Sequence, residues 1–214
     1  MEWLFYIFTI ILAYVLGSIP TSVWIGKYFH GIDVREHGSG NAGATNTVRV
    51  LGWRAGLPVL LIDMIKGLAA VSLVWFRQDL FPSPDFFVSF QLILGVAAML
   101  GHIFPVFARF KGGKGVATLT GVALAVQPWA TLSCFGVFMV FLLLFRYVSL
   151  GSIAAGIAFP LFVIFVFQTS YLALVLFSLA IAIIIIVTHH KNIRRLLQGE
   201  ESKADFLFKK KKEG

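Results

Sequence analysis

Charged residues are scarce in this sequence. Of its 214 residues only 13% are charged, whereas 58% are apolar and the mean hydropathy is +0.88. In a soluble globular domain about a quarter of the residues are typically charged, so the composition excludes a domain of that kind. Helices satisfy their own backbone hydrogen bonds in the bilayer, and the sequence therefore predicts an all-α membrane protein.

Cysteine is almost absent as well. The single cysteine, Cys134, lies within an apolar run, and one thiol excludes both a disulfide framework and a thiolate metal site. The adjacent histidines His189 and His190 lack the four-residue spacing with which two histidines share a metal on a helix. We expect Cys134 to be a core residue, and we expect neither a metal nor another cofactor.

Seven apolar runs predict seven transmembrane helices, one of them short. The first run is too long for the apolar region of a signal peptide and follows Glu2 rather than a basic segment, so we expect it to be retained. The chain, 1–214, is then a single integral-membrane domain with a basic tail from about residue 191. The runs cover residues 3–26, 55–76, 86–108, 116–126, 128–145, 150–167 and 170–188.

Basic residues alternate between the connections. Sixteen of the eighteen Lys and Arg fall in the first, third and fifth connections and the tail; Lys66 and Arg77 are the exceptions. The positive-inside rule therefore predicts an N-terminus outside and a C-terminus in the cytoplasm. The net charge of +8 is concentrated in the tail, which includes the run Lys209–Lys212. Such a tail favours contact with anionic membrane lipid rather than with nucleic acid.

The stretch GSGNAGATNTVR, residues 38–49, begins with the pattern G-x-G-x-x-G. A dinucleotide site needs a strand before this pattern and a βαβ unit around it, whereas here a short charged segment precedes and a membrane span follows. Glycines nevertheless let backbone N–H groups converge on an anion, and an arginine can hold a phosphate with two hydrogen bonds. The alternative is a polar loop rich in turn residues. The candidate phosphate ligands are Gly38, Ser39, Gly40, Asn41, Asn46 and Arg49.

The stretch FKGGKGVAT, residues 110–118, resembles a P-loop but departs from its pattern. Ala108 stands where the first glycine belongs and Gly115 follows Lys114, so ATP hydrolysis is not expected. The following run, 116–126, covers only about half of the hydrocarbon core as a helix. A helix that begins inside the membrane boundary directs its positive end at an anion, although a loop that merely sets topology remains the alternative. The candidates are Gly112, Gly113, Lys114 and Gly115.

A third stretch, THHKNIRRLLQG, spans residues 188–199. His189 and Asn192 are three residues apart, which places them on one helical face. Histidine suits general base or phosphate-binding work, but an interfacial histidine pair is an equal alternative. Asp63 and Lys66, also three residues apart, predict an ion pair inside the membrane, with or without a functional role.

Taken together, GSGNAGATN with Arg49, GHIFPVF with FKGGKG, and HxxNIxRLLxG resemble the three cytoplasmic motifs of the bacterial membrane family of acyl-phosphate:glycerol-3-phosphate acyltransferases. The resemblance implies a seven-helix enzyme of the cell inner membrane with its active site facing the cytoplasm. It would transfer a fatty acyl group from acyl phosphate to the sn-1 hydroxyl of glycerol 3-phosphate, the first step of phospholipid synthesis. The products would be lysophosphatidic acid and phosphate. No H-x-x-x-x-D follows any of the five histidines, so the signature of the other large glycerolipid acyltransferase class is absent.

The resemblance also assigns roles to individual residues. Family members commonly carry arginine at the position of His190, and the spacing to Asn192 favours His189 as the functional histidine. Ser152 matches a binding-site serine, and Glu201 matches a glutamate tied to structural integrity. The catalytic set would be Ser39, His189 and Asn192, with Arg49 and Lys114 on the phosphates.

Two questions stay open at this stage. An acyl phosphate is already activated, so positioning and charge stabilisation can supply most of the rate, and Ser39 is then a hydrogen-bond donor rather than a nucleophile. A nucleophilic Ser39 would instead form an acyl-enzyme. The rival function is a transporter for a phosphorylated metabolite, which would need polar groups at both faces. Acyl-chain length and oligomeric state are not fixed by the sequence, and a monomer is compatible with it.

Overall fold

Helices make up the regular structure of the described chain. The computed structural model describes residues 2–205. The lysine run of the tail, 209–212, for which contact with membrane lipid is predicted, lies outside the described residues. The helices are α1 (Glu2–Gly17), α2 (Thr21–His30), α3 (Ala44–Leu51), α4 (Trp53–Ser72), α5 (Pro84–Ile103), α6 (Val116–Val126), α7 (Pro128–Phe145), α8 (Val148–Leu161), α9 (Leu172–Thr188) and α10 (His190–Leu197).

Several helices are long and apolar enough to cross a membrane. Within residues 2–205 four continuous stretches qualify, and two bent pairs, α1 with α2 and α9 with α10, raise the number to six. The predicted all-helical, multi-pass membrane fold is thereby confirmed, whereas the count of seven spans stays a prediction. The four stretches are Trp53–Leu80, Pro84–Ala108, Pro128–Phe145 and Val148–Val166.

The break between α1 and α2 bends the chain by 42°. Pro20 lacks an N–H and disfavours helical backbone at Ile19, so the first span cannot continue as one straight helix. At this joint the carbonyl of Ile19 accepts from Thr21 N at 3.0 Å and from the Lys66 ammonium at 2.8 Å. The sequence run 3–26 therefore forms two helices with a polar contact at their joint.

The short helix α6 packs closely against α4. A Cβ on Gly67 of α4 would overlap the carbonyl oxygen of Thr118, and a Cβ on Gly121 of α6 would overlap that of Met64. Small residues allow this backbone approach, which is how membrane helices gain packing energy without a hydrophobic driving force. α6 begins at Val116, as predicted, with Gly115 in the left-handed conformation before it.

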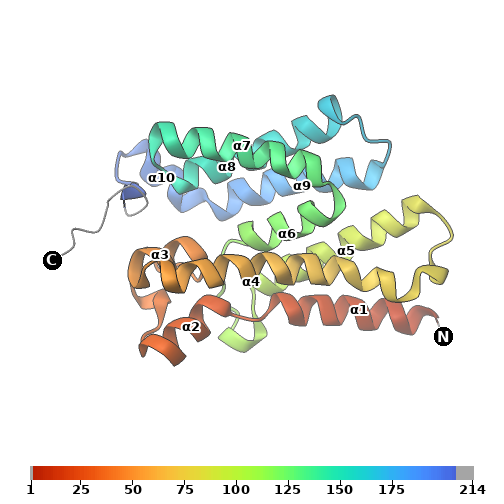
Figure 1. Ribbon diagram of the computed structural model, residues 1–214, viewed down its shortest axis with the longest axis horizontal. Helices are drawn as coiled ribbons and strands as arrows, with labels where there is room; N and C mark the ends of the chain where they lie inside the picture. Colours follow the sequence, from red (N-terminus) through yellow and green to blue (C-terminus); the bar gives the residue numbers. More distant parts are fainter. Residues whose placement is uncertain (1, 206–214) are drawn as a thin grey trace.

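The segments with polar motifs gather at one end of the bundle. Figure 1 shows α2, α3 and α10 at the end of the molecule opposite the N-terminus, while α6 lies between the α1–α4–α5 layer and the α7–α8–α9 layer. Of the two hydrophobic clusters, one is built on α1, α4 and α5, and the other extends from α4 and α5 through α6 to α7, α8 and α9. This arrangement brings three distant parts of the chain to one face.

Candidate active site

Asn46 holds the first glycine loop in place through hydrogen bonds. Gly38 and Gly40 adopt positive φ angles of 62° and 70°, which glycine tolerates best. Asn46 is 1% exposed; its Oδ1 accepts from Ser39 N at 2.8 Å and from Ser39 Oγ at 3.1 Å. Its Nδ2 donates to the carbonyls of Val34 and His37. These four bonds use the whole amide, so Asn46 braces the loop instead of facing a phosphate as expected.

Ser39 stands at the surface of this loop. Its hydroxyl donates to the amide oxygen of Asn46, and an amide oxygen is too weak a base to take the proton from a serine. This contact therefore orients Ser39 without activating it as a nucleophile.

The second glycine loop folds back on the end of α5. Gly112 N donates to Ile103 O at 3.1 Å and Gly113 N donates to His102 O at 3.2 Å. Lys114 then extends toward α10, where its ammonium donates to Asn192 Oδ1 at 2.5 Å. Burial lowers the pKa of Lys114 to about 8; the Glu201 charge raises it, while Arg195 and Arg49 lower it further. The predicted second and third motifs thus meet through one hydrogen bond.

His189 occupies the 59° bend between α9 and α10, not the face of one continuous helix as the spacing predicts. The ring is buried, and Nδ1 donates to the carbonyl of Ile185 at 2.8 Å, which leaves Nε2 as the acceptor. Burial and then the Lys114 charge lower the pKa of His189 to about 4. A base of that pKa accepts a proton poorly at neutral pH.

Glu201 joins α8 to α10. Its Oε1 accepts from Ser149 Oγ at 2.8 Å and from Asn192 Nδ2 at 2.6 Å, and its Oε2 accepts from Arg195 Nε at 2.6 Å. Burial raises the pKa of this carboxyl, but the three hydrogen bonds outweigh burial and lower the pKa below its usual value. The predicted structural role of Glu201 agrees with these contacts, which hold Asn192 toward Lys114.

Ser149 is a residue that the sequence interpretation missed. The expected binding serine, Ser152, is buried one turn further along α8, and its hydroxyl donates to Val148 O within the same helix. Ser149 instead reaches Glu201. Both serines lie in one polar connection, and the sequence contains no signal that shows which of them faces the C-terminal segment.

A polar pocket of about 280 Å³ lies where the three motifs meet. Thr188, Lys191 and Arg195 line it although the sequence analysis assigned them no role, and His190 lines it although the spacing to Asn192 favoured His189. The other candidates are not part of this lining: Gly38, Asn46, Arg49, Gly112, Gly115, Ser152, His189 and Glu201. Among residues 2–205 no group of three metal-binding side chains is placed to hold a metal ion. The pocket lining consists of Ser39, Gly40, Asn41, Gly113, Lys114, Thr188, His190, Lys191, Asn192 and Arg195.

The charge of this region favours an anion. Lys114, Lys191 and Arg195 line the pocket. The half-buried Arg49 is close enough to Glu201 and Arg195 for their charges to act on it, although burial is the main cause of its lowered pKa. One carboxylate, Glu201, neutralises only part of this positive charge. The site therefore suits a phosphate-bearing ligand, which fills basic sites through charge-assisted hydrogen bonds.

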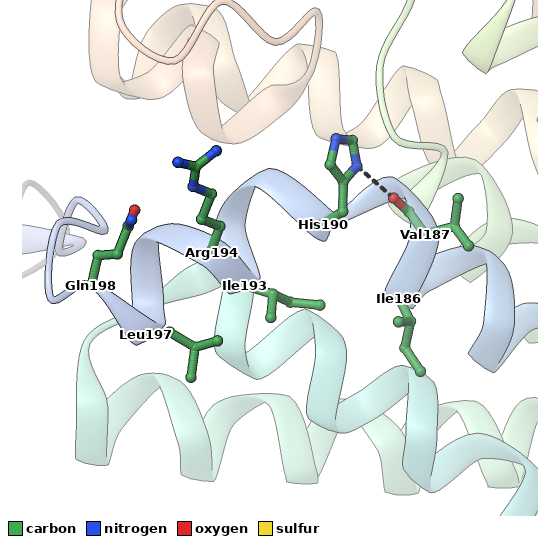
Figure 2. Close-up of a pocket in the computed structure, with 7 residues that line it drawn as sticks. All are labelled: Ile186, Val187, His190, Ile193, Arg194, Leu197 and Gln198. Carbon is green, nitrogen blue, oxygen red and sulfur yellow. Dashed lines mark hydrogen bonds between the residues drawn. The ribbon is translucent and has the colours of Figure 1, made fainter.

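An apolar groove of about 630 Å³ adjoins the polar pocket through His190. Figure 2 shows Ile186, Ile193 and Leu197 pointing to one side of the bent α9–α10 pair, and His190 and Arg194 pointing to the other. His190 Nδ1 donates to the Val187 carbonyl at 2.8 Å, which fixes the ring at the junction. Apolar surface thus continues directly from a cationic pocket.

Fold and site together define a class: a multi-pass membrane protein with a basic pocket at one end of its helix bundle that suits a phosphate-bearing molecule. Residues 7–199 match the family model described as glycerol-3-phosphate acyltransferase. The chain belongs to the glycerol-3-phosphate acyltransferase family.

Two relatives and two solved structures illustrate the match. The glycerol-3-phosphate acyltransferase of Chlorobaculum tepidum is 45% identical over 221 residues, with 92% of this chain and 95% of the relative covered. That of Chlorobium limicola is 44% identical over 222 residues, with 91% and 94% covered. The glycerol 3-phosphate form of PlsY (YgiH), an integral membrane glycerol 3-phosphate acyltransferase, superposes with a TM-score of 0.84 at 40% identity over 95% of this chain and 99% of that one. Its lysophosphatidic acid form gives 0.81 at 38% identity with the same coverage.

Proposed function

We propose that this protein transfers a fatty acyl group from acyl phosphate to the sn-1 hydroxyl of glycerol 3-phosphate, releasing lysophosphatidic acid and phosphate. The observation that carries the proposal is the single basic pocket in which both glycine loops and α10 meet. Family membership supports the reaction, since relatives over nearly the whole chain are glycerol-3-phosphate acyltransferases.

The residues of the pocket suit two phosphates close together. Lys114 of the second glycine loop and Arg195 of α10 line the same pocket, and Asn192 and Glu201 hold them in place. An acyl phosphate is a mixed anhydride, so its carbonyl needs no covalent activation. The protein then acts by positioning the hydroxyl and by stabilising charge on the leaving phosphate.

The attacking hydroxyl loses its proton to a phosphate oxygen of the substrate in this proposal. His189 is a poor base because burial lowers its pKa to about 4, and Ser39 has an amide oxygen as its partner rather than a base. We therefore assign Ser39 as a hydrogen-bond donor to the substrate, whose arrival turns the single O–H of Ser39 away from Asn46 Oδ1, the acceptor in the structure. Intact-mass analysis after incubation with acyl phosphate alone should show no acyl adduct; an acylated Ser39 would contradict the assignment.

The apolar groove beside the pocket suits the acyl chain. It begins at His190, which lines both cavities. Ile186, Val187, Ile193 and Leu197 supply its apolar lining, and Arg194 and Gln198 also line it. A chain placed there leaves its activated carbonyl at the edge of the basic pocket.

We also propose seven spans, with the N-terminus outside and the active site facing the cytoplasm of the cell inner membrane. α6 counts as the seventh although its 11 residues extend only about 16 Å. The alternation of basic residues along the chain supports this orientation. The gathering of α2, α3 and α10 at one end supports a single polar face.

The test uses purified full-length protein in liposomes with acyl phosphate and glycerol 3-phosphate. Lys114→Ala should raise KM by about tenfold or more, because it removes a charged group of the pocket lining. Arg49→Ala should raise KM as well, because Arg49, which lies outside the lining, adds positive charge near Arg195 and Glu201. Lys111→Ala is the matched control, since this exposed lysine lies in the same loop but outside the pocket lining. Full activity of both variants would contradict the proposal. Uptake of glycerol 3-phosphate without acyl transfer would favour the transporter instead.

A further inference from the structure

A buried charged cluster connects the centre of the bundle to the glycine loops. Asp63 and Lys66 of α4 form an ion pair of 2.8 Å, and both side chains are 3% exposed. Thr21 of α2 donates its hydroxyl to Asp63 Oδ1 at 3.0 Å. His102, near the end of α5, is the third member of the cluster. It lies on the side of the glycine loops and is 7% exposed. The expected ion pair is thus part of a larger network.

The ammonium of Lys66 determines the state of the His102 ring. Its three N–H groups have three neighbours: Asp63 Oδ1 at 2.8 Å, Ile19 O at 2.8 Å and His102 Nδ1 at 3.2 Å. An ammonium only donates, so Nδ1 of His102 accepts, and the ring hydrogen then resides on Nε2.

The Nε2 edge of His102 lies against Gly113. A Cβ built on Gly113 would overlap His102 Nε2 and would lie 2.7 Å from the carbonyl oxygen of Ala42. Gly113 is therefore enclosed between α5 and the first glycine loop, to which Ala42 belongs. Its own N–H donates to His102 O, so ring and backbone of His102 support it together.

The path between the two loops is consequently short. Gly113 precedes Lys114, whose ammonium lies in the basic pocket, and Ala42 follows the loop segment of Ser39, Gly40 and Asn41. The chain between α5 and α6 reaches this position only through left-handed backbone at Arg109 and Phe110, φ 56° and 59°. Such strained backbone persists where surrounding contacts determine it.

We propose that Asp63, Lys66 and His102 form a positioning unit that holds Gly113 between the two glycine loops and so sets the separation of their phosphate-binding groups. The unit does not touch the substrate. It acts through His102, whose orientation the ion pair fixes, and this role rests on the proposed function of the pocket. A buried ion pair is weak evidence for stability, because desolvation offsets its attraction, and a role in orientation explains its presence better.

The first test changes the ring. His102→Asn retains an oxygen near the Nδ1 position for Lys66 but removes the edge that supports Gly113. We expect KM for glycerol 3-phosphate to rise about tenfold while the melting temperature stays within a few degrees of the unmodified protein, because small displacements at a site cost large factors in rate or binding. His102→Gln, which restores a polar group near the Nε2 position, should recover most of the loss.

The second test removes the ion pair as a whole. In the double variant Asp63→Asn/Lys66→Met no uncompensated charge remains in the bundle. We expect a raised KM and faster hydrogen exchange in peptides covering residues 111–116. Thr9→Ala is the control, since Thr9 is equally buried but donates only to the carbonyls of Phe5 and Tyr6 within α1.

The outcomes separate the two proposals. An unmodified protein that neither binds glycerol 3-phosphate by calorimetry nor transfers an acyl group would refute the proposed function, while the exchange comparison would still decide the positioning role. Unchanged KM and unchanged exchange at 111–116 in the His102 and double variants would refute the positioning role. A change in melting temperature alone would assign the cluster to stability and equally refute it.

Discussion

Lys114 shows how a single side chain depends on residues far away in the sequence. Its ammonium meets Asn192, Asn192 meets Glu201, and Glu201 meets Ser149 and Arg195. Burial of this lysine is the main cause of a pKa of about 8. At neutral pH the group is largely protonated, and a bound phosphate dianion favours the protonated form further.

This pKa predicts a pH dependence. Phosphate binding needs the ammonium, so kcat/KM should be maximal below pH 8 and should fall as the pH rises through the pKa of about 8. Above it the fall should approach about tenfold per pH unit, as for loss of one proton from the free enzyme. The pH dependence of kcat/KM is measured from initial rates between pH 7 and pH 10, in inert buffers of constant ionic strength.

Lys114→Arg is the control for that profile. A guanidinium stays protonated throughout this pH range, so the variant should show a lower but flat kcat/KM. A descending limb at the same pH in the arginine variant would show that another group is responsible.

For individual residues, the sequence predicted which ones lie at the site better than it predicted their roles there. Ser39, Lys114 and Asn192 were proposed from residue type and spacing, and the pocket contains all three. Asn46 was expected at the phosphate, yet its four hydrogen bonds belong to the loop, a result that only the path of the backbone reveals. The role of Ser149 was missed because its partner, Glu201, is 52 residues away in the sequence. Arg195 was missed although it belongs to the third motif and is six residues from Glu201.

The element that positions the second loop is α6. It starts at Val116, directly after Gly115, and packs against α4 through two glycines, Gly67 and Gly121, at which an added Cβ would have no room. A displaced α6 therefore carries the glycine loop and Lys114 with it.

Gly121→Ala should consequently damage activity. The added methyl would overlap the Met64 carbonyl oxygen, so α6 must move away from α4. We expect a lower melting temperature and a loss of acyl transfer of about tenfold or more, since overpacking forces backbone shifts. Gly136→Ala on α7 is the matched control: nothing lies within 4 Å of its added Cβ, and alanine favours helix. Equal effects of both substitutions would contradict the role of this contact.

The groove at the bent α9–α10 pair makes a separate prediction. Ile186→Trp should fill part of the groove and lower activity with palmitoyl phosphate by about tenfold, while activity with octanoyl phosphate changes little, because a shorter chain avoids the blocked part. Ile183→Trp, one turn earlier on α9 and outside the groove lining, should leave both rates unchanged. Rates with the two donors under saturating glycerol 3-phosphate give the comparison, and equal losses with both donors would remove the groove from the acyl site.

At the scale of the whole molecule the orientation in the membrane is testable. In a Cys134→Ala background, Gln78→Cys and Lys203→Cys place one exposed thiol near each end of the bundle. We expect a membrane-impermeant maleimide to label Gln78→Cys in right-side-out vesicles and Lys203→Cys in inverted ones, as the distribution of basic residues predicts. The reverse pattern would invert the proposed topology.

Composition was sufficient to predict the class of fold, because the bilayer permits few alternatives to helices. Composition was insufficient to predict where the helices bend. Pro20 marks the first bend in the sequence, but the 59° bend at His189 follows a long apolar run without proline or glycine, so neither hydropathy nor a helix-breaking residue indicates it. The count of spans is uncertain from sequence for the same reason.

The ion pair of α4 also has a consequence for biogenesis. A charged residue near the middle of a helix costs about 2.5–3.5 kcal/mol on insertion scales, and α4 carries two, Asp63 and Lys66. Two of their partners, Ile19 and Thr21, are synthesised earlier, whereas His102 is synthesised later. The first bent helix pair must therefore stay beside the insertion machinery until α4 arrives, so that the nascent chain supplies its own counter-groups before the third span emerges.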